Sequence, residues 1–447
     1  MSKLYKVLLA VLVAGTISFT ASAQDDYWSS RTDRSGITTD KAVARISYPK
    51  EFKLFTLNVA PLRQQLFSIV GSQASRQSTV ISLPNANGQM EQFEVYEASN
   101  FEPALQDRFP EIRAYSGKGI TDPAAFLKLS FSPQGVQTMV FRDNGPNEYI
   151  EPYSQDHTIY SVFTAQRNKG GLPWVCSTPD QQLAAGINSQ LGNRVESNAG
   201  QLKTMRLAQS CNGEYSNFFG ATSSAQVALV LAAYNATLTR CNGCYERDLA
   251  IHLNLVPESV NVIYYNPATD PYTTLSNWNT ELQITLNTSL TGPATPLATN
   301  NAAYDIGHMF GASGGGGNAG CIGCVCVDGN VSGTGATKGR GITSPADGIP
   351  MGDNFDIDYV AHEVGHQMGA NHTFSFSLEG TGVNKEVGSG ITIMGYAGIT
   401  NQDVAPHSID IFNMSSIDQI QVNMATKSCP ITTSLTGINA TPVVAPV

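Results

Sequence analysis

Residues 362–372 most constrain what this chain can fold into, because three side chains that can bind a metal ion and one carboxylate that can assist it lie close together there. They are His362, Glu363, His366 and His372, with Gly369 before the last histidine. Residues four apart share one face of an α-helix, so His362 and His366 can hold one metal ion, with Glu363 beside them near a metal-bound water. Gly369 suits the left-handed conformation that ends a helix and returns His372 as a third imidazole. Three protein ligands with an open fourth position are typical of catalytic zinc.

The residues before this motif predict the helix that carries it. Asp356 and Asp358 are acidic residues of the kind that a first helical turn prefers. Apolar residues then keep helical spacing at positions 357, 360, 361 and 364. Two histidines four apart can also be ordinary polar-face residues of such a helix, but the glycine and the third histidine argue against that interpretation.

Two stretches carry a resemblance to a known group of enzymes. Residues 362–372 resemble the extended zinc motif of the metzincin metallopeptidases, and Met394, 22 residues after His372, lies in a stretch similar to the metzincin Met-turn. Within that group the chain resembles the bacterial secreted reprolysin-like (adamalysin-type) peptidases over about residues 201–430. The stretches that carry this closer resemblance are 245–248, 304–308 and 339–343.

The resemblance implies roles for individual residues. It implies that His362, His366 and His372 bind one Zn²⁺, that Glu363 is the general base, and that Met394 forms an apolar floor below the metal. Met394 can equally be a plain core methionine.

Tyr396 lies two residues after Met394. A tyrosine there approaches the zinc or stabilises the oxyanion in astacin-like and serralysin-like metzincins, but reprolysin-like enzymes generally lack that role. A function next to the metal and ordinary packing both stay open for Tyr396.

The N-terminus predicts export. Lys3 and Lys6 precede the apolar run 7–14, and small residues at 21–23 offer a cleavage site, so residues 1–23 are expected to be a signal peptide. No later stretch approaches the length of a membrane span. We therefore expect a secreted protein, extracellular or periplasmic. The net charge of −10 and the lack of a basic stripe argue against nucleic acid as a partner. The oligomeric state is not predicted.

Residues 24–198 are expected to form a β-rich prodomain. Apolar and polar residues alternate along 127–131 and 136–140, and a turn signal follows at 143–145. His157 is expected at the surface. The chain is polar from about 171 to 202, as in an exposed connection, and Arg194 and Lys203 are candidate processing points there.

Residues 199–432 are expected to form the catalytic domain, followed by a linker-like tail at 433–447. The patterns predict strands at 204–208, 249–255, 260–265 and 304–310, and helices at 224–238 (capped by Ser224) and 279–290. Strands that alternate with long helices imply a mostly parallel sheet. The fold class is thus α/β (α+β): a metzincin-like domain with a mostly parallel twisted sheet, long helices and a smaller C-terminal subdomain, behind a β-rich prodomain.

Residues 311–320 are rich in glycine and lie between a predicted strand and the zinc helix. No Gly-Lys-Ser/Thr ending follows, which excludes a phosphate-binding loop. We expect this stretch to form a mobile rim of the active-site cleft. In metzincins the edge strand near this position pairs with extended substrate. Packing or surface roles are expected for His252 and His308.

The eight cysteines favour disulfides over a second zinc site in an exported protein. The two close groups, Cys241/Cys244 and the cysteines within 321–326, could form disulfides or a second zinc site. The sequence does not indicate which cysteines pair with each other. Cys176 has two interpretations. It can form a disulfide with the catalytic region, or it can take the open zinc position as a latency switch, as the resemblance to reprolysin-like zymogens implies.

These observations predict a secreted zinc endopeptidase made as a zymogen, acting on protein or peptide substrates. A zinc hydrolase of esters or non-peptide amides, and a binding or adhesion protein with a degenerate site, are the alternatives. An accessory calcium ion stays open, with no motif to support it.

Overall fold

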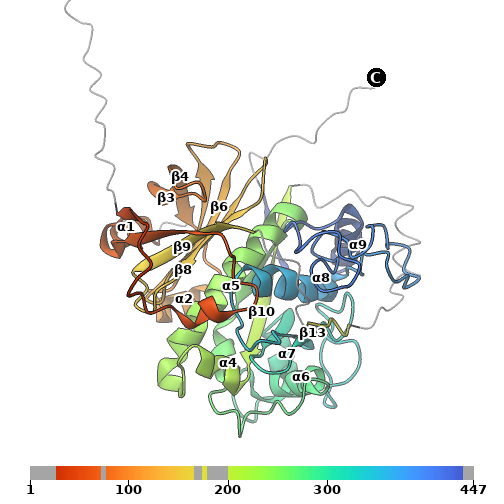
Figure 1. Cartoon of the computed structure of the whole chain (residues 1–447). Helices are drawn as coiled ribbons and strands as arrows, with labels where there is room; N and C mark the ends of the chain where they lie inside the picture. Colours follow the sequence, from red (N-terminus) through yellow and green to blue (C-terminus); the bar gives the residue numbers. More distant parts are fainter. Residues whose placement is uncertain (1–26, 72–76, 166–173, 179–199, 436–447) are drawn as a thin grey trace, which may run out of the picture.

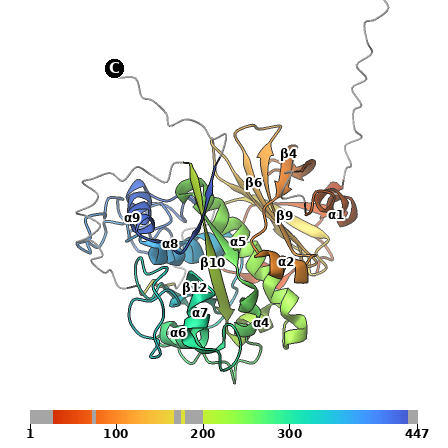
Figure 2. The same ribbon diagram turned by 180° about the vertical axis from the view of Figure 1, so that it is seen from behind.

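The computed structural model describes residues 27–71, 77–165, 174–178 and 200–435, which contain two β-sheets (Figures 1 and 2). The predicted signal peptide (1–23), Arg194 and residues 436–447 of the predicted tail lie outside the described residues. No helix within the described residues has both the length and the apolar character that a membrane span requires.

The N-terminal region contains a nine-stranded antiparallel sheet, in the order β1-β2-β9-β8-β7-β6-β5-β4-β3. Its strands are β1 (Trp28–Arg31), β2 (Lys53–Leu57), β3 (Ser78–Pro84), β4 (Met90–Glu97), β5 (Arg113–Gly119), β6 (Phe126–Ser132), β7 (Gly135–Phe141), β8 (Glu148–Pro152) and β9 (Ile159–Thr164). Its helices are η1 (Lys41–Ala44), α1 (Val59–Phe67) and α2 (Pro103–Arg108). The predicted β-rich character of this region is confirmed.

The second region contains a six-stranded sheet that is mostly parallel, as predicted. The path is β11-β10-β12-β14-β13, with parallel pairs except at β13, and β15 pairs antiparallel with β10. The strands are β10 (Gln201–Cys211), β11 (Ile251–Leu255), β12 (Ile306–Phe310), β13 (Gly316–Asn318), β14 (Gly341–Ser344) and β15 (Ile431–Ser434). The helices are α4 (Gly213–Phe218), η2 (Ser224–Gln226), α5 (Val227–Leu249), η3 (Pro257–Val262), α6 (Trp278–Ser289), α7 (Leu297–Ala302), η4 (Asn354–Ala361), α8 (His362–Met368) and α9 (Met414–Ala425).

Three local predictions differ from the structure. The first half of the predicted strand 260–265 belongs to the short helix η3, which starts at Pro257, and Ile263 makes an isolated β-bridge with Cys211. Ser224 does not cap the long helix, because it lies in the turn η2 before α5. The helix also runs to Leu249, beyond the predicted end at 238.

The predicted boundaries on either side of the second region also need correction. Lys203, a candidate processing point, lies inside β10, where it is buried and its Nζ donates to the Met424 carbonyl at 2.6 Å. A protease cannot reach this backbone in the folded chain. At the other end, Thr433 and Ser434 belong to β15, so the predicted tail does not begin at 433.

Helix α5 lies between the nine-stranded sheet and the segment η4–α8 (Figure 1), and it packs against both. The hairpin β6–β7 shows the alternation that the sequence predicts, with Leu129 opposite Thr138. Its polar face is buried as well, because α5 covers it: Lys128 lies 2.6 Å from Glu246 of α5. One hydrophobic core therefore contains residues of both regions, such as Tyr149 and Leu231.

Candidate metal centre

The helical segment η4–α8 carries three of the four candidate side chains. The first turn contains Asp356, as expected, but this residue is buried. Its carboxylate accepts hydrogen bonds from Thr237 at 2.7 Å and from Arg240 at 2.9 Å, both on α5. The acidic residue therefore fixes the segment against α5, in addition to its position near the positive end of the helix dipole.

The three predicted histidines converge on one point. Nε2 of His366 lies 3.1 Å from Nε2 of His362 and 3.0 Å from Nε2 of His372. The Sγ atom of Cys176 completes a group of four possible ligand atoms that all lie within 4.8 Å of one another. All four residues are buried. The spacing in the sequence thus gives the predicted convergence.

The far nitrogen of each ring has an acceptor beside it. Nδ1 of His362 lies 2.7 Å from the Ile393 carbonyl, and Nδ1 of His366 lies 2.7 Å from the Ala370 carbonyl. Nδ1 of His372 lies 3.1 Å from Oε1 of Glu379. Acceptors at Nδ1 place the proton there and leave the Nε2 lone pair of each ring directed at the common centre.

This donor set fits a zinc ion. Three buried lone pairs that face one another repel unless a cation lies between them, and burial and the two neighbouring histidines lower the pKa of His366, which disfavours a proton as that cation. Ligands about 2.0–2.1 Å from a tetrahedral zinc are about 3.3 Å apart, close to the separations of the Nε2 atoms. Imidazole and thiolate are also ligand types that zinc prefers.

Glu363 lies next to this group and is fully buried. Its Oε2 accepts a hydrogen bond from Thr178 at 2.9 Å, and its Oε1 has no hydrogen-bond partner among the described residues. Burial raises the pKa of Glu363 to about 7, against the hydrogen bonds from Cys176 and Thr178, which lower it. The side chain packs against Gly317 of β13, where any Cβ atom would collide with its carboxylate.

Gly369 and Met394 lie at the positions that the sequence indicates. Gly369 ends α8 with a φ of 131°, a conformation that favours glycine, and its N–H donates to the carbonyls of Gly365 and His366. Met394 is fully buried, and its sulfur would lie 2.6 Å from a Cβ atom at Gly365. Met394 therefore packs against the helix between His362 and His366, which fits the floor predicted for it.

Cys176 belongs to a short extended segment that lies along β13. The Ser177 N–H donates to the Gly317 carbonyl at 2.8 Å, and the Gly317 N–H donates to the Val175 carbonyl at 3.1 Å. The pairing is parallel and places Cys176 beside Gly317. Part of the glycine-rich stretch 311–320 is thus an edge strand that binds extended backbone, and the backbone bound here is the chain's own.

Tyr396 lies at the metal centre. Its hydroxyl is 3.0 Å from Nε2 of His372 and 3.5 Å from the Cys176 carbonyl. Burial raises the pKa of Tyr396, and Cys176 and Glu363 raise it further, so the hydroxyl keeps its proton as a hydrogen-bond donor. The hydroxyl therefore lies beside the possible metal ligands, while the ring packs against Phe374 and Phe376.

The eight cysteines separate into two disulfides and four thiols among the described residues. The disulfides are Cys321–Cys324 and Cys326–Cys429. Cys176, Cys211, Cys241 and Cys244 are free and buried. Of the two interpretations of Cys176, the disulfide with the catalytic region is therefore not formed. Cys241 and Cys244 are likewise not bonded, because they lie inside α5 and donate to the carbonyls of Asp356 and Asp410.

The other histidines lie away from this centre. His308 is buried between Gln367 and Thr343, and burial lowers its pKa to about 4, so it packs as a neutral ring as expected. His252 is held by Glu246 at 2.7 Å. His157 was expected at the surface, but it is half-buried, with Nε2 3.5 Å from Asp40.

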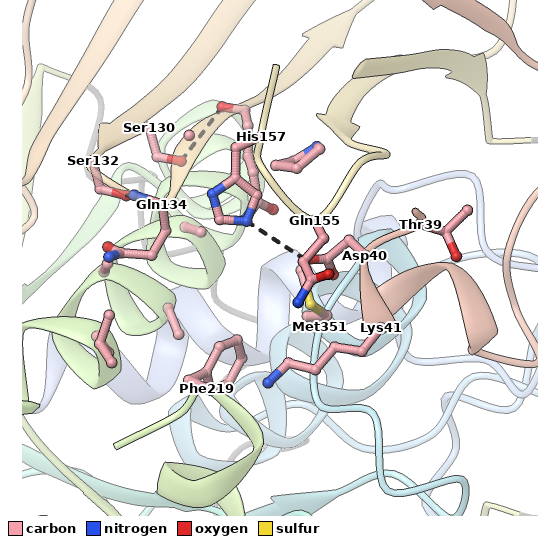
Figure 3. Close-up of a pocket in the computed structure, with 17 residues that line it drawn as sticks. Thr39, Asp40, Lys41, Ser130, Ser132, Gln134, Gln155, His157, Phe219 and Met351 are labelled. Atoms are coloured by element: carbon pink, nitrogen blue, oxygen red, sulfur yellow. Dashed lines mark hydrogen bonds and ion pairs between the residues drawn. The ribbon is translucent and has the colours of Figure 1, made fainter. Parts of the chain in front are cut away.

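His157 lines a cavity of about 470 Å³ between the N-terminal region and α5. Figure 3 shows its ring directed at Asp40, with Lys41 and Phe219 across the space. Polar side chains of β6 and β7 face alanines of α5 across it. The cavity contains none of the four possible metal ligands, so it is separate from the metal centre.

Sequence reasoning missed three residues that contact the centre or its ligands, and a fourth that packs behind them. The three are Trp174, Thr178 and Glu379, and Tyr359 stacks on Trp174. Trp174 and Thr178 lie two residues on either side of Cys176, so strand alternation around that cysteine could have indicated them. Glu379 and Tyr359 carry no comparable signal in the sequence.

Comparison with known families agrees with this geometry. Residues 201–423 match the family described as "Metallo-peptidase family M12B Reprolysin-like". A search among curated proteins finds no match. The match covers α5, η4, α8 and the three converging histidines, whereas Cys176 lies before it. Through residues 201–423, the chain belongs to the reprolysin-like metallopeptidases of family M12B.

Proposed function

We propose that the chain is a secreted zinc-dependent endopeptidase that is made as a latent zymogen. The observation that carries this proposal is the convergence of three Nε2 atoms, 3.0–3.1 Å apart, beside a buried carboxylate. His362, His366 and His372 would hold the ion. When bound, zinc supplies a Lewis acid that activates water and polarises the scissile carbonyl.

The side chains around the ion would move the protons. Glu363, next to the three histidines, would accept a proton from the attacking water and deliver it to the departing amine as the general base. The Tyr396 hydroxyl, 3.0 Å from Nε2 of His372, is placed to donate a hydrogen bond to the developing oxyanion. Met394 and the acceptors at Nδ1 hold the histidines in place.

The edge strand β13 supports endopeptidase activity. It pairs with residues 175–177 through backbone hydrogen bonds, the kind of pairing that an extended substrate makes. The chain continues at both ends of this segment, so the strand accommodates the middle of a polypeptide and not only its terminus. A substrate bound in this way would be cut internally.

The same segment would keep the enzyme latent. With Cys176 among the possible ligand atoms, its thiolate can take the fourth position that the catalytic arrangement leaves open for water. The N-terminal region would act as a prodomain that must leave before substrate binds. The signal-like N-terminus and the two disulfides support export.

The proposal is tested with the full chain after proteolytic maturation, using casein as a general substrate. Hydrolysis should require zinc and stop with a chelator. Glu363→Gln should retain zinc and lose activity by a factor on the order of 10² or more, because the general base is removed. Glu258→Gln, on η3, is the control. Equal turnover by Glu363→Gln and wild type would contradict the mechanism.

A further inference from the structure

The hairpin β6–β7 has a polar face that is turned towards α5. Near one end of this face, Lys128 meets Glu246 of α5 at 2.6 Å. Ser130, Ser132 and Gln137 continue the same face, because residues two apart share one side of a strand and Ser130 pairs with Gln137. The α5 residues that line the opposite wall are Leu229, Ala232, Ala233 and Ala236. Methyl groups are too short to reach the strands, so a cavity of about 470 Å³ is left between them.

The polar wall of this cavity consists of hydroxyl and amide groups. They belong to Ser130, Ser132, Gln134, Gln137 and Gln155. Such groups both donate and accept hydrogen bonds. Oε1 of Gln134 is buried without a partner among the described residues, and the Ser130 hydroxyl reaches the Gln137 carbonyl only at 3.4 Å. The wall therefore has hydrogen-bonding capacity that the surrounding protein does not use.

The charged groups at this cavity balance one another. Asp40 and Lys41 are neighbours in the sequence, and Nε2 of His157 lies 3.5 Å from Asp40. Nζ of Lys41 lies 4.2 Å from the ring centroid of Phe218. Figure 3 shows Lys41 and Phe219 on the side of the space opposite His157. With one carboxylate and one ammonium group, the cavity suits a neutral ligand better than an ion.

We propose that this cavity is a binding site for a neutral saccharide of one or two rings. Its volume lies within the range of small-molecule sites. A pyranose ring has hydroxyl groups around its rim and C–H groups on its faces. It can therefore hydrogen-bond with the serine and glutamine side chains while it packs on the alanines of α5 and on Phe219. Water would satisfy the polar wall but would gain nothing from the apolar one.

A ligand in this cavity would contact both regions of the chain. The hydroxyl and amide wall belongs to the N-terminal region, whereas Phe219, α5 and Met351 belong to the second region. A ligand that binds only the joined form stabilises that form by mass action. A bound saccharide would thus hold the enzyme latent. This consequence rests on the proposed function, whereas the binding site does not.

The first experiment measures binding to the unprocessed full chain and needs no turnover. Glucose, galactose, N-acetylglucosamine, maltose and cellobiose are titrated by calorimetry, and at least one should bind saturably with one site per chain. At ten times its Kd, that saccharide should raise the ratio of folded to unfolded chain about tenfold. The tetrasaccharide of the same sugar distinguishes the sources: equal affinity assigns the site to the end of a glycan chain, and weaker binding assigns it to a free sugar.

Three variants locate the binding in this cavity. Ala233→Leu fills the space and should abolish binding, and thermal unfolding without saccharide shows that the variant is folded. Gln137→Ala removes one polar partner and should raise the Kd about fivefold or more. Gln89→Ala, which changes an exposed glutamine, should bind as wild type does. No saturable binding of any of these saccharides, or equal binding to wild type and Ala233→Leu, would overturn the proposed site.

The second experiment follows maturation in the presence of the saccharide that binds best, at ten times its Kd. Casein hydrolysis should appear up to about tenfold more slowly in wild type and at an unchanged rate in Ala233→Leu. An unchanged rate in wild type would overturn the effect on latency. If zinc-loaded, matured wild type hydrolysed no casein while the saccharide still bound, the proposed function would be wrong and the binding site would stand.

Discussion

Thr178 donates a hydrogen bond of 2.9 Å from its hydroxyl to Oε2 of Glu363, and it accepts one of 2.7 Å from the Ala319 N–H. One residue thus connects the proposed general base to the backbone next to β13. Because Cys176 lies two positions earlier on the same face, the segment occupies the metal position and the base at once. Latency would then depend on two contacts rather than on the thiol alone.

Thr178→Val should therefore weaken latency. The substitution leaves the buried Ala319 N–H and Glu363 without their partner, which costs about 1 kcal/mol or more and raises the population of the displaced segment at least about fivefold. The measurement is hydrolysis of a quenched peptide by the unprocessed chain. Thr178→Ser keeps the hydroxyl and should match wild type. Equal basal activity in Thr178→Val and wild type would show that the contact has no role in latency.

The contact between Lys128 and Glu246 should make the stability of the chain depend on pH. Burial acts to raise the pKa of Glu246, but Lys128 and His252 outweigh it and lower that pKa to about 2. The contribution to stability is therefore complete above the ordinary pKa of about 4.5 and is lost as the pH falls towards 2. Urea unfolding at several pH values should show a smaller acid-dependent loss in Glu246→Gln than in wild type. An identical loss of stability at low pH in Glu246→Gln and wild type would contradict the role proposed for Glu246.

Glu151 should be among the costliest residues to remove from the interface between the two regions. It lies 2.6 Å from Arg45 and 2.9 Å from Arg240, and all three side chains are 1% exposed. Glu151→Ala leaves these guanidinium groups short of buried negative charge, with an expected cost of about 3–5 kcal/mol in the free energy of unfolding. Glu111→Ala removes the exposed pair with Arg63 and should cost less than about 1 kcal/mol. The free energy of unfolding of both variants is measured by denaturant unfolding. Similar losses of stability in Glu151→Ala and Glu111→Ala would contradict the expected difference between the buried and the exposed ion pair.

The two disulfides should contribute unequally to stability. Cys326–Cys429 joins residues 103 positions apart, whereas Cys321–Cys324 joins residues 3 apart. Loop-closure entropy alone gives about 4–5 kcal/mol for the first and about 2 kcal/mol for the second. The paired variants Cys326→Ser/Cys429→Ser and Cys321→Ser/Cys324→Ser measure this by thermal unfolding. A larger loss in the second variant would contradict the expectation.

The metal-centre geometry was predictable from the sequence because it depends on local spacing. His362 and His366 share a helical face, and the turn at Gly369 brings His372 back to them. Residues 362–372 therefore determine most of the geometry of the three ligands. The strands of the second sheet were also predictable where alternation or long apolar runs dominate. The predicted strand 260–265 shows where this fails, since Val260 and Val262 lie in the short helix η3, and a short apolar run does not distinguish a strand from a helical turn.

The remaining features depend on contacts between distant parts of the chain. Lys128 looks like the solvent-facing residue of an alternating strand, and only α5, more than 100 residues later, buries it. Thr178 and Glu363 are 185 residues apart, and no local pattern connects them. The cysteines at 241 and 244 resemble the close group at 321–326 in spacing, but their position inside a buried helix keeps them as thiols.

The most direct test of the account is zinc K-edge X-ray absorption on the purified, unprocessed full chain, together with its zinc content. The account predicts one zinc per chain with three imidazole nitrogens and one sulfur, and loss of the sulfur in Cys176→Ala. A folded wild-type chain that binds no zinc, or a zinc ion without histidine ligands, would contradict it.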